Sequence, residues 1–260
     1  RDLRMSRGLG DVYKRQVFGQ IVAMFLALIL NHSKNKEVRI NFRSFTPNWR
    51  TISIIYQVGV PSIIMQSISS VMTFGMNKIL IGFSETAVAV FGVYFKLQSF
   101  LFMPIFGLNN GMIPIVAYNY GARSKKRIME TVWLSIGIAV GIMLIGLMVF
   151  HLMTPQLLML FQADEEMLAI GVPALRIISL SFLFAGYCII VGSVFQALGN
   201  GVYSLIISVA RQLVCILPLA WFFARTFGLH AVWLSLPLAE ITSVVLSSIL
   251  FRKIYLDKIK

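Results

Sequence analysis

Two oppositely charged residues, Arg211 and Glu240, each interrupt a long apolar stretch of the sequence. An unpaired charge in the middle of a bilayer costs at least about 2.5–3.5 kcal/mol. At about 1.5 Å per helical residue, both would lie near the midplane of a hydrocarbon core about 30 Å thick. Because a short loop joins the two stretches, we expect these side chains to pair. A role for Glu240 as a proton or cation site in a cavity stays open.

Lys96 is a third candidate for a buried charge, since it also lies within an apolar stretch. Its side chain is long enough to carry the ammonium group to a membrane surface while the stem stays in apolar surroundings.

Neutral polar residues recur at helical spacing nearer the N-terminus, at Gln66, Ser70, Thr73 and Asn77. Steps of four, three and four residues place all of them on one face of a helix. In a bilayer such a face must meet protein or water rather than lipid. The pattern predicts either the wall of a substrate cavity, to which Tyr94 would add an aromatic ring, or hydrogen bonds between helices.

The sequence gives little evidence for an enzyme active site or a metal site. The sequence holds no HExxH and no GxSxG, and His32, His151 and His230 stand apart from one another. Both cysteines fall within apolar stretches, so no disulfide framework is implied. We predict a protein that is not an enzyme and has neither a metal site nor a resident cofactor.

The composition is that of a membrane protein. Of the 260 residues, 58% are hydrophobic and 13% are charged, and the mean hydropathy is +0.82. The net charge of +13 comes from basic clusters between apolar stretches. Such clusters indicate topology and contacts with lipid headgroups rather than binding of nucleic acid.

We predict an all-α polytopic membrane protein with a six-helix bundle over 52–252, preceded by a truncated helix. The expected spans are 52–83, 85–120, 128–152, 172–198, 202–224 and 229–251. Pro61, Pro104 and Pro114 should kink the first two of them. Gly137 and Gly141 form a GxxxG pattern that predicts a close helix contact.

The N-terminal region predicts three segments. The apolar segment 17–30 would make about 21 Å of helix, which is too short to cross a bilayer, so we interpret it as the end of a truncated transmembrane helix. The polar and basic segment 1–16 fits nothing that follows and is interpreted as a non-native leader. The basic segment 31–51 is expected to be a linker.

The basic residues also predict the orientation. The linker 31–51, the turn 121–127 and the tail 253–260 are basic, whereas 83–85 and 153–171 hold no Lys or Arg. The three basic segments should therefore be cytoplasmic. The leader 1–16 would then carry its charges on the wrong side, which supports its interpretation as foreign to the natural protein.

A family resemblance rests on the segment PIFGLNNGMIPIVAYNYGARSKKR (104–127). A proline, a glycine, a second proline, then YNYGA and basic residues resemble the eighth membrane helix of the multidrug and toxic compound extrusion (MATE) transporters. Further matches are FQALGNGVYSLIISVARQLVCILPLAWFF (195–223) and GLHAVWLSLPLAE (228–240). The order and spacing of these motifs extend the resemblance over roughly 17–253.

The resemblance implies one half of a twelve-helix protein that has two lobes. This chain is similar to the end of the sixth helix, the cytoplasmic linker and the complete C-terminal lobe. The implied function is efflux of drugs and small organic cations by antiport against Na⁺ or H⁺. The implied location is the cell membrane, which is the inner membrane in a cell that has two membranes. Membrane lipids and a missing N-terminal lobe would be the partners.

In some subgroups of that family, acids on the seventh and tenth helices bind the coupling cation. The corresponding stretches here, 52–83 and 172–198, hold no buried acid. The coupling ion would then bind in the missing lobe or at Glu240. Two alternatives stay open: a lipid-linked oligosaccharide flippase of the same broad fold, and a membrane subunit or scaffold that does not transport.

Overall fold

The computed structural model describes residues 2–34 and 46–259, without the side chains of 2–16, 32, 54, 57, 58 and 259. The chain divides into two compact units, Arg1–Ile52 and Ser53–Lys260. The described backbone is helical apart from short turns, which confirms the predicted all-α class.

The first unit consists mainly of α1 (Asp2–Lys34). Its apolar part, Val17–Asn31, is shorter than a membrane span. The helix crosses the predicted boundary between 16 and 17 without a break, so the backbone does not separate the two segments. The interpretation of 1–16 as a leader stays a prediction. The predicted linker 31–51 is helical at both ends, and its centre, 35–45, lies outside the described residues.

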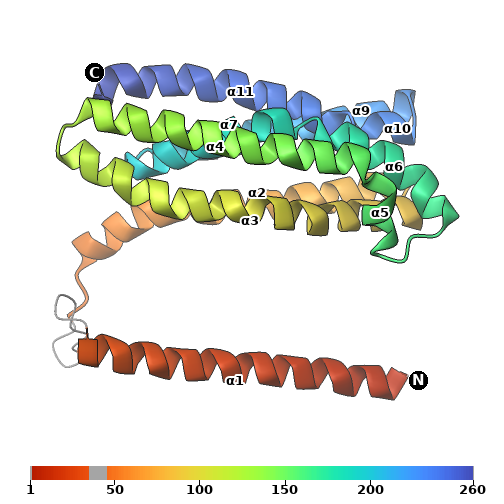
Figure 1. Cartoon of the computed structure of the whole chain (residues 1–260), viewed down its shortest axis with the longest axis horizontal. Helices are drawn as coiled ribbons and strands as arrows, with labels where there is room; N and C mark the ends of the chain where they lie inside the picture. Colours follow the sequence, from red (N-terminus) through yellow and green to blue (C-terminus); the bar gives the residue numbers. More distant parts are fainter. Residues whose placement is uncertain (1, 35–45, 260) are drawn as a thin grey trace. The chain divides into compact units, whose positions relative to one another are not determined.

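The second unit is a bundle of helices (Figure 1). In chain order its elements are α2 (Trp49–Leu80), α3 (Glu85–Gly121), α4 (Lys125–Leu152), α5 (Thr154–Met159), α6 (Glu165–Ser179), α7 (Phe182–Ala197), α8 (Gly201–Val209), the π-helix η2 (Ala210–Ile216), α9 (Leu217–Thr226), α10 (Leu229–Val232), α11 (Ser235–Ile254) and the π-helix η3 (Tyr255–Ile259).

Within the described residues, four helical stretches are long and apolar enough to cross a membrane: 85–121, 125–152, 201–226 and 229–258. The bent pair α6 and α7 makes a fifth if it counts as one span. These five correspond to the last five predicted spans. The first predicted span is α2, which is 32 residues long and lies outside this set, and some of its side chains are not described.

The predicted start and the predicted continuity of the span 172–198 are both wrong. It begins earlier, at Glu165, and breaks into α6 and α7, whose axes differ by 50°. The early start follows from Asp164, whose carboxylate accepts the backbone N–H of Met167 at 2.8 Å and caps the helix. At the break, the carbonyl of Ile178 accepts both the backbone N–H of Ser181 at 3.0 Å and the Ser181 hydroxyl at 2.7 Å.

A π-helical stretch interrupts the span 201–226. The segment η2 (Ala210–Ile216) lies between α8 and α9 and carries Arg211 and Gln212. In a π-helix each N–H bonds to the carbonyl five residues back, and such turns occur frequently at functional sites. The predicted tail 253–260 is helical as far as it is described, to Ile259 in η3, where the Lys258 ammonium donates to the carbonyl of Leu198 at 3.0 Å.

The most extensive helix contact in the bundle joins α4 to α7. A Cβ atom on Gly186 would lie 3.1 Å from the backbone of Ala139. Gly137 and Gly141, the GxxxG glycines predicted to make a close helix contact, would meet nothing within 4 Å if a Cβ atom were added to them. That prediction is wrong, because the face of α4 that packs holds Ala139 instead.

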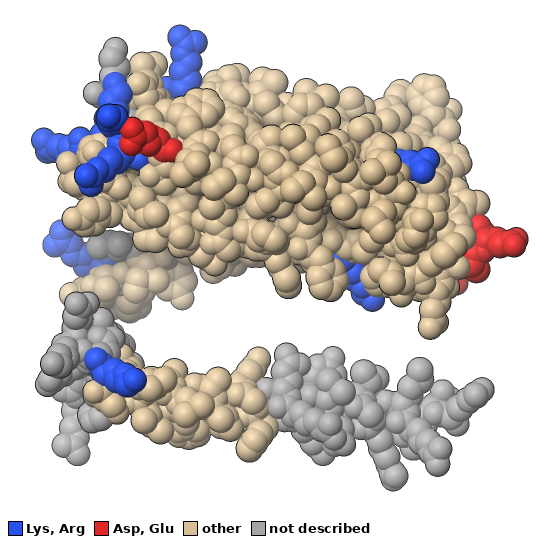
Figure 2. All heavy atoms as spheres, viewed as in Figure 1, with Lys and Arg blue, Asp and Glu red and all other residues tan. Residues whose placement is uncertain are grey.

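Charge is distributed unevenly between the ends of the bundle. Figure 2 shows most Lys and Arg gathered at the end where α4 begins and α11 finishes, with an acidic group among them, and further acidic residues at the opposite end, with isolated basic residues nearby. The basic end holds Arg123, Lys125, Lys126, Arg127, Arg252, Lys253 and Lys258, and the acidic end holds Glu85, Asp164, Glu165 and Glu166. This is the asymmetry expected of a protein with one cytoplasmic face.

Candidate functional site

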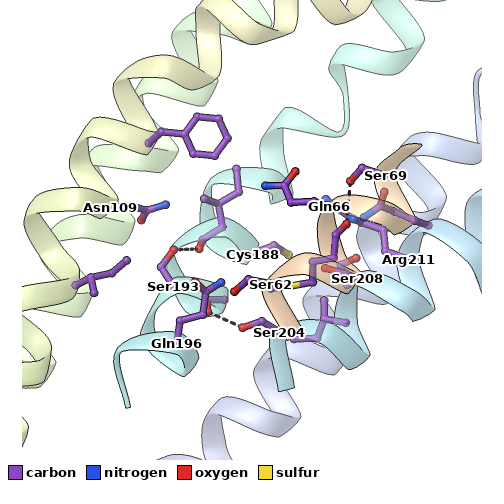
Figure 3. Close-up of a pocket in the computed structure, with 18 of the residues that line it drawn as sticks. Ser62, Gln66, Ser69, Asn109, Cys188, Ser193, Gln196, Ser204, Ser208 and Arg211 are labelled. Carbon is purple, nitrogen blue, oxygen red and sulfur yellow. Dashed lines mark hydrogen bonds between the residues drawn. The ribbon is translucent and has the colours of Figure 1, made fainter. Parts of the chain in front are cut away.

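A chamber of about 460 Å³ lies where α2, α3, α7, α8, η2 and α11 face one another (Figure 3). We call it the large chamber. Its apolar lining includes Met65, Phe106, Ile113, Ile189 and Ile207. Its polar lining is Ser62, Gln66, Ser69, Asn109, Asn110, Ser193, Gln196, Ser204, Ser208, Arg211, Gln212 and Ser243. Neutral amides and hydroxyls therefore dominate its polar surface.

A second chamber of about 270 Å³, the small chamber, shares Ser69, Phe106, Arg211 and Gln212 with the large one. Aromatic side chains from α3 form much of its wall, namely Tyr94, Phe95, Phe102 and Phe106. Glu240 of α11 also lines it. The two chambers thus meet at η2.

Arg211 and Glu240 form the predicted ion pair. Nη1 of Arg211 lies 3.2 Å from Oε2 and 3.4 Å from Oε1 of Glu240. The Glu240 side chain is 6% exposed and that of Arg211 is 32% exposed. Because Glu240 also lines the small chamber, pairing and a cavity position coexist. Among the described lining residues of both chambers, these two alone are charged.

The polar stripe of α2 does not face a single space. Gln66 lines the large chamber, and Thr73 lines the small chamber. Ser70 and Asn77 instead line a shallow groove on the outer side of α2, which Thr73 also reaches. The Thr73 hydroxyl donates to the carbonyl of Ser69 at 2.9 Å, within its own helix. A role for these four residues in binding stays a prediction.

Tyr94 and Lys96, two positions apart on α3, have opposite surroundings. Tyr94 is 2% exposed, lines the small chamber and stacks on Phe91 with ring centroids 6.2 Å apart. Lys96 is exposed, and its ammonium lies 5.8 Å from the centre of the Phe161 ring. The expectation that Lys96 is a buried charge is therefore wrong, because its long side chain reaches the bundle surface.

Sequence reasoning missed several polar residues of the chambers. Gln212 is 4% exposed and follows Arg211 in η2. Asn109 is 6% exposed, and its Oδ1 is buried with no hydrogen-bond partner among the described residues. A signal was present in both cases, since each is an amide inside an apolar stretch. The helical period alone does not say which side of the helix the chamber occupies.

No group of three or more His, Cys, Asp or Glu side chains that could hold a metal ion occurs among the described residues. Cys188 lines the large chamber and, like Cys215, is a free thiol.

Comparison with known proteins places this geometry in context. The family model MatE matches residues 61–222. The multidrug export protein MepA of Staphylococcus aureus (strain bovine RF122 / ET3-1) is 28% identical over 223 residues, which cover 84% of this chain and 48% of the relative. MepA of Staphylococcus haemolyticus (strain JCSC1435) is 25% identical over 232 residues, covering 89% and 51%.

Solved structures match along most of this chain. A MOP superfamily transporter from Pyrococcus furiosus superposes with a TM-score of 0.81 at 26% identity, covering 90% of this chain and 53% of the other. A MATE crystal structure in the bent conformation gives a TM-score of 0.80 at 26% identity, covering 89% and 52%. The chain spans about half the length of the relatives it matches.

Proposed function

The chain belongs to the MatE family, and from this premise we propose that it forms one lobe of a multidrug efflux antiporter. The observation that carries the proposal is the large chamber of about 460 Å³, which six helical segments border and which mostly neutral polar and apolar side chains line. Ligand sites of this size combine apolar walls with a few polar groups that fix orientation.

The chamber walls suit varied small organic molecules, with cations among them. Met65 in the large chamber and Met72 in the small one are flexible and polarisable, so they can adapt to different ligand shapes. The rings of Tyr94, Phe95 and Phe102 present faces that attract organic cations. Relatives of about twice this length carry the name multidrug export protein, which supports the proposed activity.

Alternating access would couple this lobe to a second, N-terminal lobe and to a Na⁺ or H⁺ gradient. The coupling ion would bind in that other lobe or at Glu240. In this proposal the basic end of the bundle, the linker 31–51 and the C-terminal tail face the cytoplasm, and the protein resides in the cell membrane. The asymmetry of Figure 2 supports this orientation.

The flippase alternative receives less support. The two chambers hold one described cation, Arg211, and it is already paired with Glu240. A site for pyrophosphate-linked sugars would need more positive charge. A membrane scaffold protein that does not transport would not require a polar chamber inside its helix bundle.

The test is a transport assay on the complete gene product that contains this sequence, in proteoliposomes loaded with ethidium. The Na⁺ and pH gradients are imposed separately. We expect ethidium flux with one gradient and background flux with neither. Absence of flux under both gradients, with the protein folded, would contradict the proposed function.

A further inference from the structure

Seven exposed basic side chains gather at one end of the bundle (Figure 2). They belong to two segments that are far apart in the sequence, 123–127 and 252–258. The acidic residues in and beside these segments are Glu130 and Asp257, so seven positive charges less two negative ones leave an excess of five. Among the described residues, Lys126 alone of the seven has a carboxylate partner, Glu130 at 3.8 Å. This end therefore carries positive charge that the described chain does not neutralise.

Two of these ammonium groups are held in place by aromatic rings rather than by carboxylates. Nζ of Lys125, at the start of α4, lies 5.2 Å from the centre of the Tyr255 ring in η3. Nζ of Lys253 lies 5.9 Å from the centre of the Tyr203 ring in α8. A ring face attracts a cation but leaves its net charge in place, and an ammonium has three N–H donors. Lys125 can therefore still donate to an anion.

Arg252 stands at the end of an exposed apolar stripe on α11. Ile241, Val245 and Ile249 are 47%, 52% and 60% exposed and recur every four residues, which places them on one face of the helix. Arg252 follows Ile249 by three residues on that face and is exposed. The helix belongs to the stretch 229–258, which is long and apolar enough to cross a membrane. The stripe therefore faces acyl chains, and Arg252 lies at the depth of the headgroups.

The stripe and the basic end meet at Tyr255. Arg252 and Tyr255 are three residues apart on one continuous helical segment, so their side chains are neighbours on its surface. The ammonium of Lys125 lies against the same ring. A guanidinium from α11 and an ammonium from α4 are thus brought together beside one aromatic ring. Both groups donate to phosphate, and arginine can do so through two parallel hydrogen bonds.

We propose that this arrangement is a binding site for one anionic phospholipid, with phosphatidylglycerol as its simplest ligand. The phosphate accepts hydrogen bonds from Arg252 and Lys125, and an acyl chain lies along the stripe formed by Ile241, Val245 and Ile249. The bound lipid joins the start of α4 to the end of α11. The site lies at the lipid-facing surface and is independent of the chambers and of transport.

The charge of the site selects against zwitterionic lipids. Phosphatidylcholine carries a fixed cation beside its phosphate, which the excess positive charge repels, whereas phosphatidylglycerol carries a neutral glycerol there. A basic side chain at the membrane surface strengthens the attraction of an anionic lipid by roughly fivefold. With Arg252 and Lys125 acting together, we expect phosphatidylglycerol to bind about 20-fold more tightly than phosphatidylcholine.

The experiment measures lipid binding to the purified chain by native mass spectrometry. The chain in detergent is titrated with dioleoyl phosphatidylglycerol or dioleoyl phosphatidylcholine, and the apparent dissociation constant of the first bound lipid is compared. A further arm adds glycerophosphoglycerol, the same headgroup without acyl chains, in large excess. It should not displace the lipid, because it makes no contact with the apolar stripe.

Three single variants test the assignment of the site. K125Q and R252Q should each weaken phosphatidylglycerol binding about fivefold and leave phosphatidylcholine binding unchanged. The matched control is K126Q, which removes the same charge one residue away, from a side chain that already pairs with Glu130. Its affinity for phosphatidylglycerol should stay within about twofold of the unmodified chain. All three side chains are exposed, and equal melting temperatures would show that the fold is retained.

Four results would overturn the proposal. The unmodified chain binds both lipids equally, or K125Q and K126Q weaken phosphatidylglycerol binding to the same extent, which would mean a diffuse effect of charge. Displacement by glycerophosphoglycerol would show a site for soluble phosphates instead. A complex of two chains that excludes lipid would show that a second copy covers the stripe.

Discussion

Replacement of Gly186 by alanine should destabilise the bundle, whereas the same replacement at Gly137 should not. Gly186 lies on α7 where that helix packs on α4, and a new Cβ atom would lie 3.1 Å from the carbonyl carbon and oxygen of Ala139 and from the nitrogen of Val140. All three are backbone atoms, so the two helices must separate to admit the methyl group. A Cβ on Gly137 would meet nothing within 4 Å.

The two contributions have opposite signs. Alanine in place of glycine favours a helix by about 0.5–1 kcal/mol. Overpacking of a close contact costs about 1–3 kcal/mol. We therefore expect G186A to lose up to about 2.5 kcal/mol and G137A to gain about 0.5–1 kcal/mol. For a chain of this size, 1 kcal/mol corresponds to about 2–4 °C in melting temperature.

The assay is thermal unfolding in detergent, followed with a thiol-reactive dye in a C215S background, so that the dye labels only Cys188, which is 8% exposed in the folded chain. G186A should melt several degrees below the unmodified chain, and G137A at or slightly above it. Equal rises in both variants would refute the reasoning, because they would mean that α4 and α7 do not approach as closely at Gly186 as described.

Three further predictions concern other parts of the chain. In the same assay, R211Q and E240Q should each destabilise the bundle, and R211Q/E240Q should do so by less than their sum, with a coupling energy of about 1.5 kcal/mol or more; additive effects would argue against the ion pair. Deletion of 1–16 should leave the melting temperature unchanged, since those residues lie outside the unit Ser53–Lys260; a clear decrease would show that they support the bundle. The chain by itself in liposomes should give no gradient-driven flux of ethidium, because it spans about half the length of its relatives; measurable flux would show that it forms a complete pathway without a second lobe.

Much of the fold could be predicted from the apolar stretches of the sequence and from the positions of its charged residues. The runs ending near Gly121 and Leu152 each became a helix with nearly the predicted bounds, because a bilayer forces the backbone of an apolar stretch to satisfy its own hydrogen bonds. The ion pair was accessible for a related reason, since two opposite charges at similar depth on consecutive helices have few other partners.

The packing of individual side chains could not be predicted from the sequence. Helical period placed Gln66, Ser70, Thr73 and Asn77 on one face, but only the neighbouring helices decide that Gln66 meets the large chamber while Ser70 and Asn77 meet an outer groove. The break between α6 and α7 likewise has no proline at its position, so local sequence gave little warning of it.

The π-helical stretch Ala210–Ile216 has a consequence for comparing this protein with its homologues. A π turn takes up one residue more than an α turn, because its hydrogen bond reaches one residue farther back. Loss of one residue here would close the ladder into an ordinary α-helix and leave α8 and α9 on the faces they already occupy. Related sequences can therefore differ by a single-residue insertion within this span. An alignment that denies them that gap will match Arg211 to the wrong position.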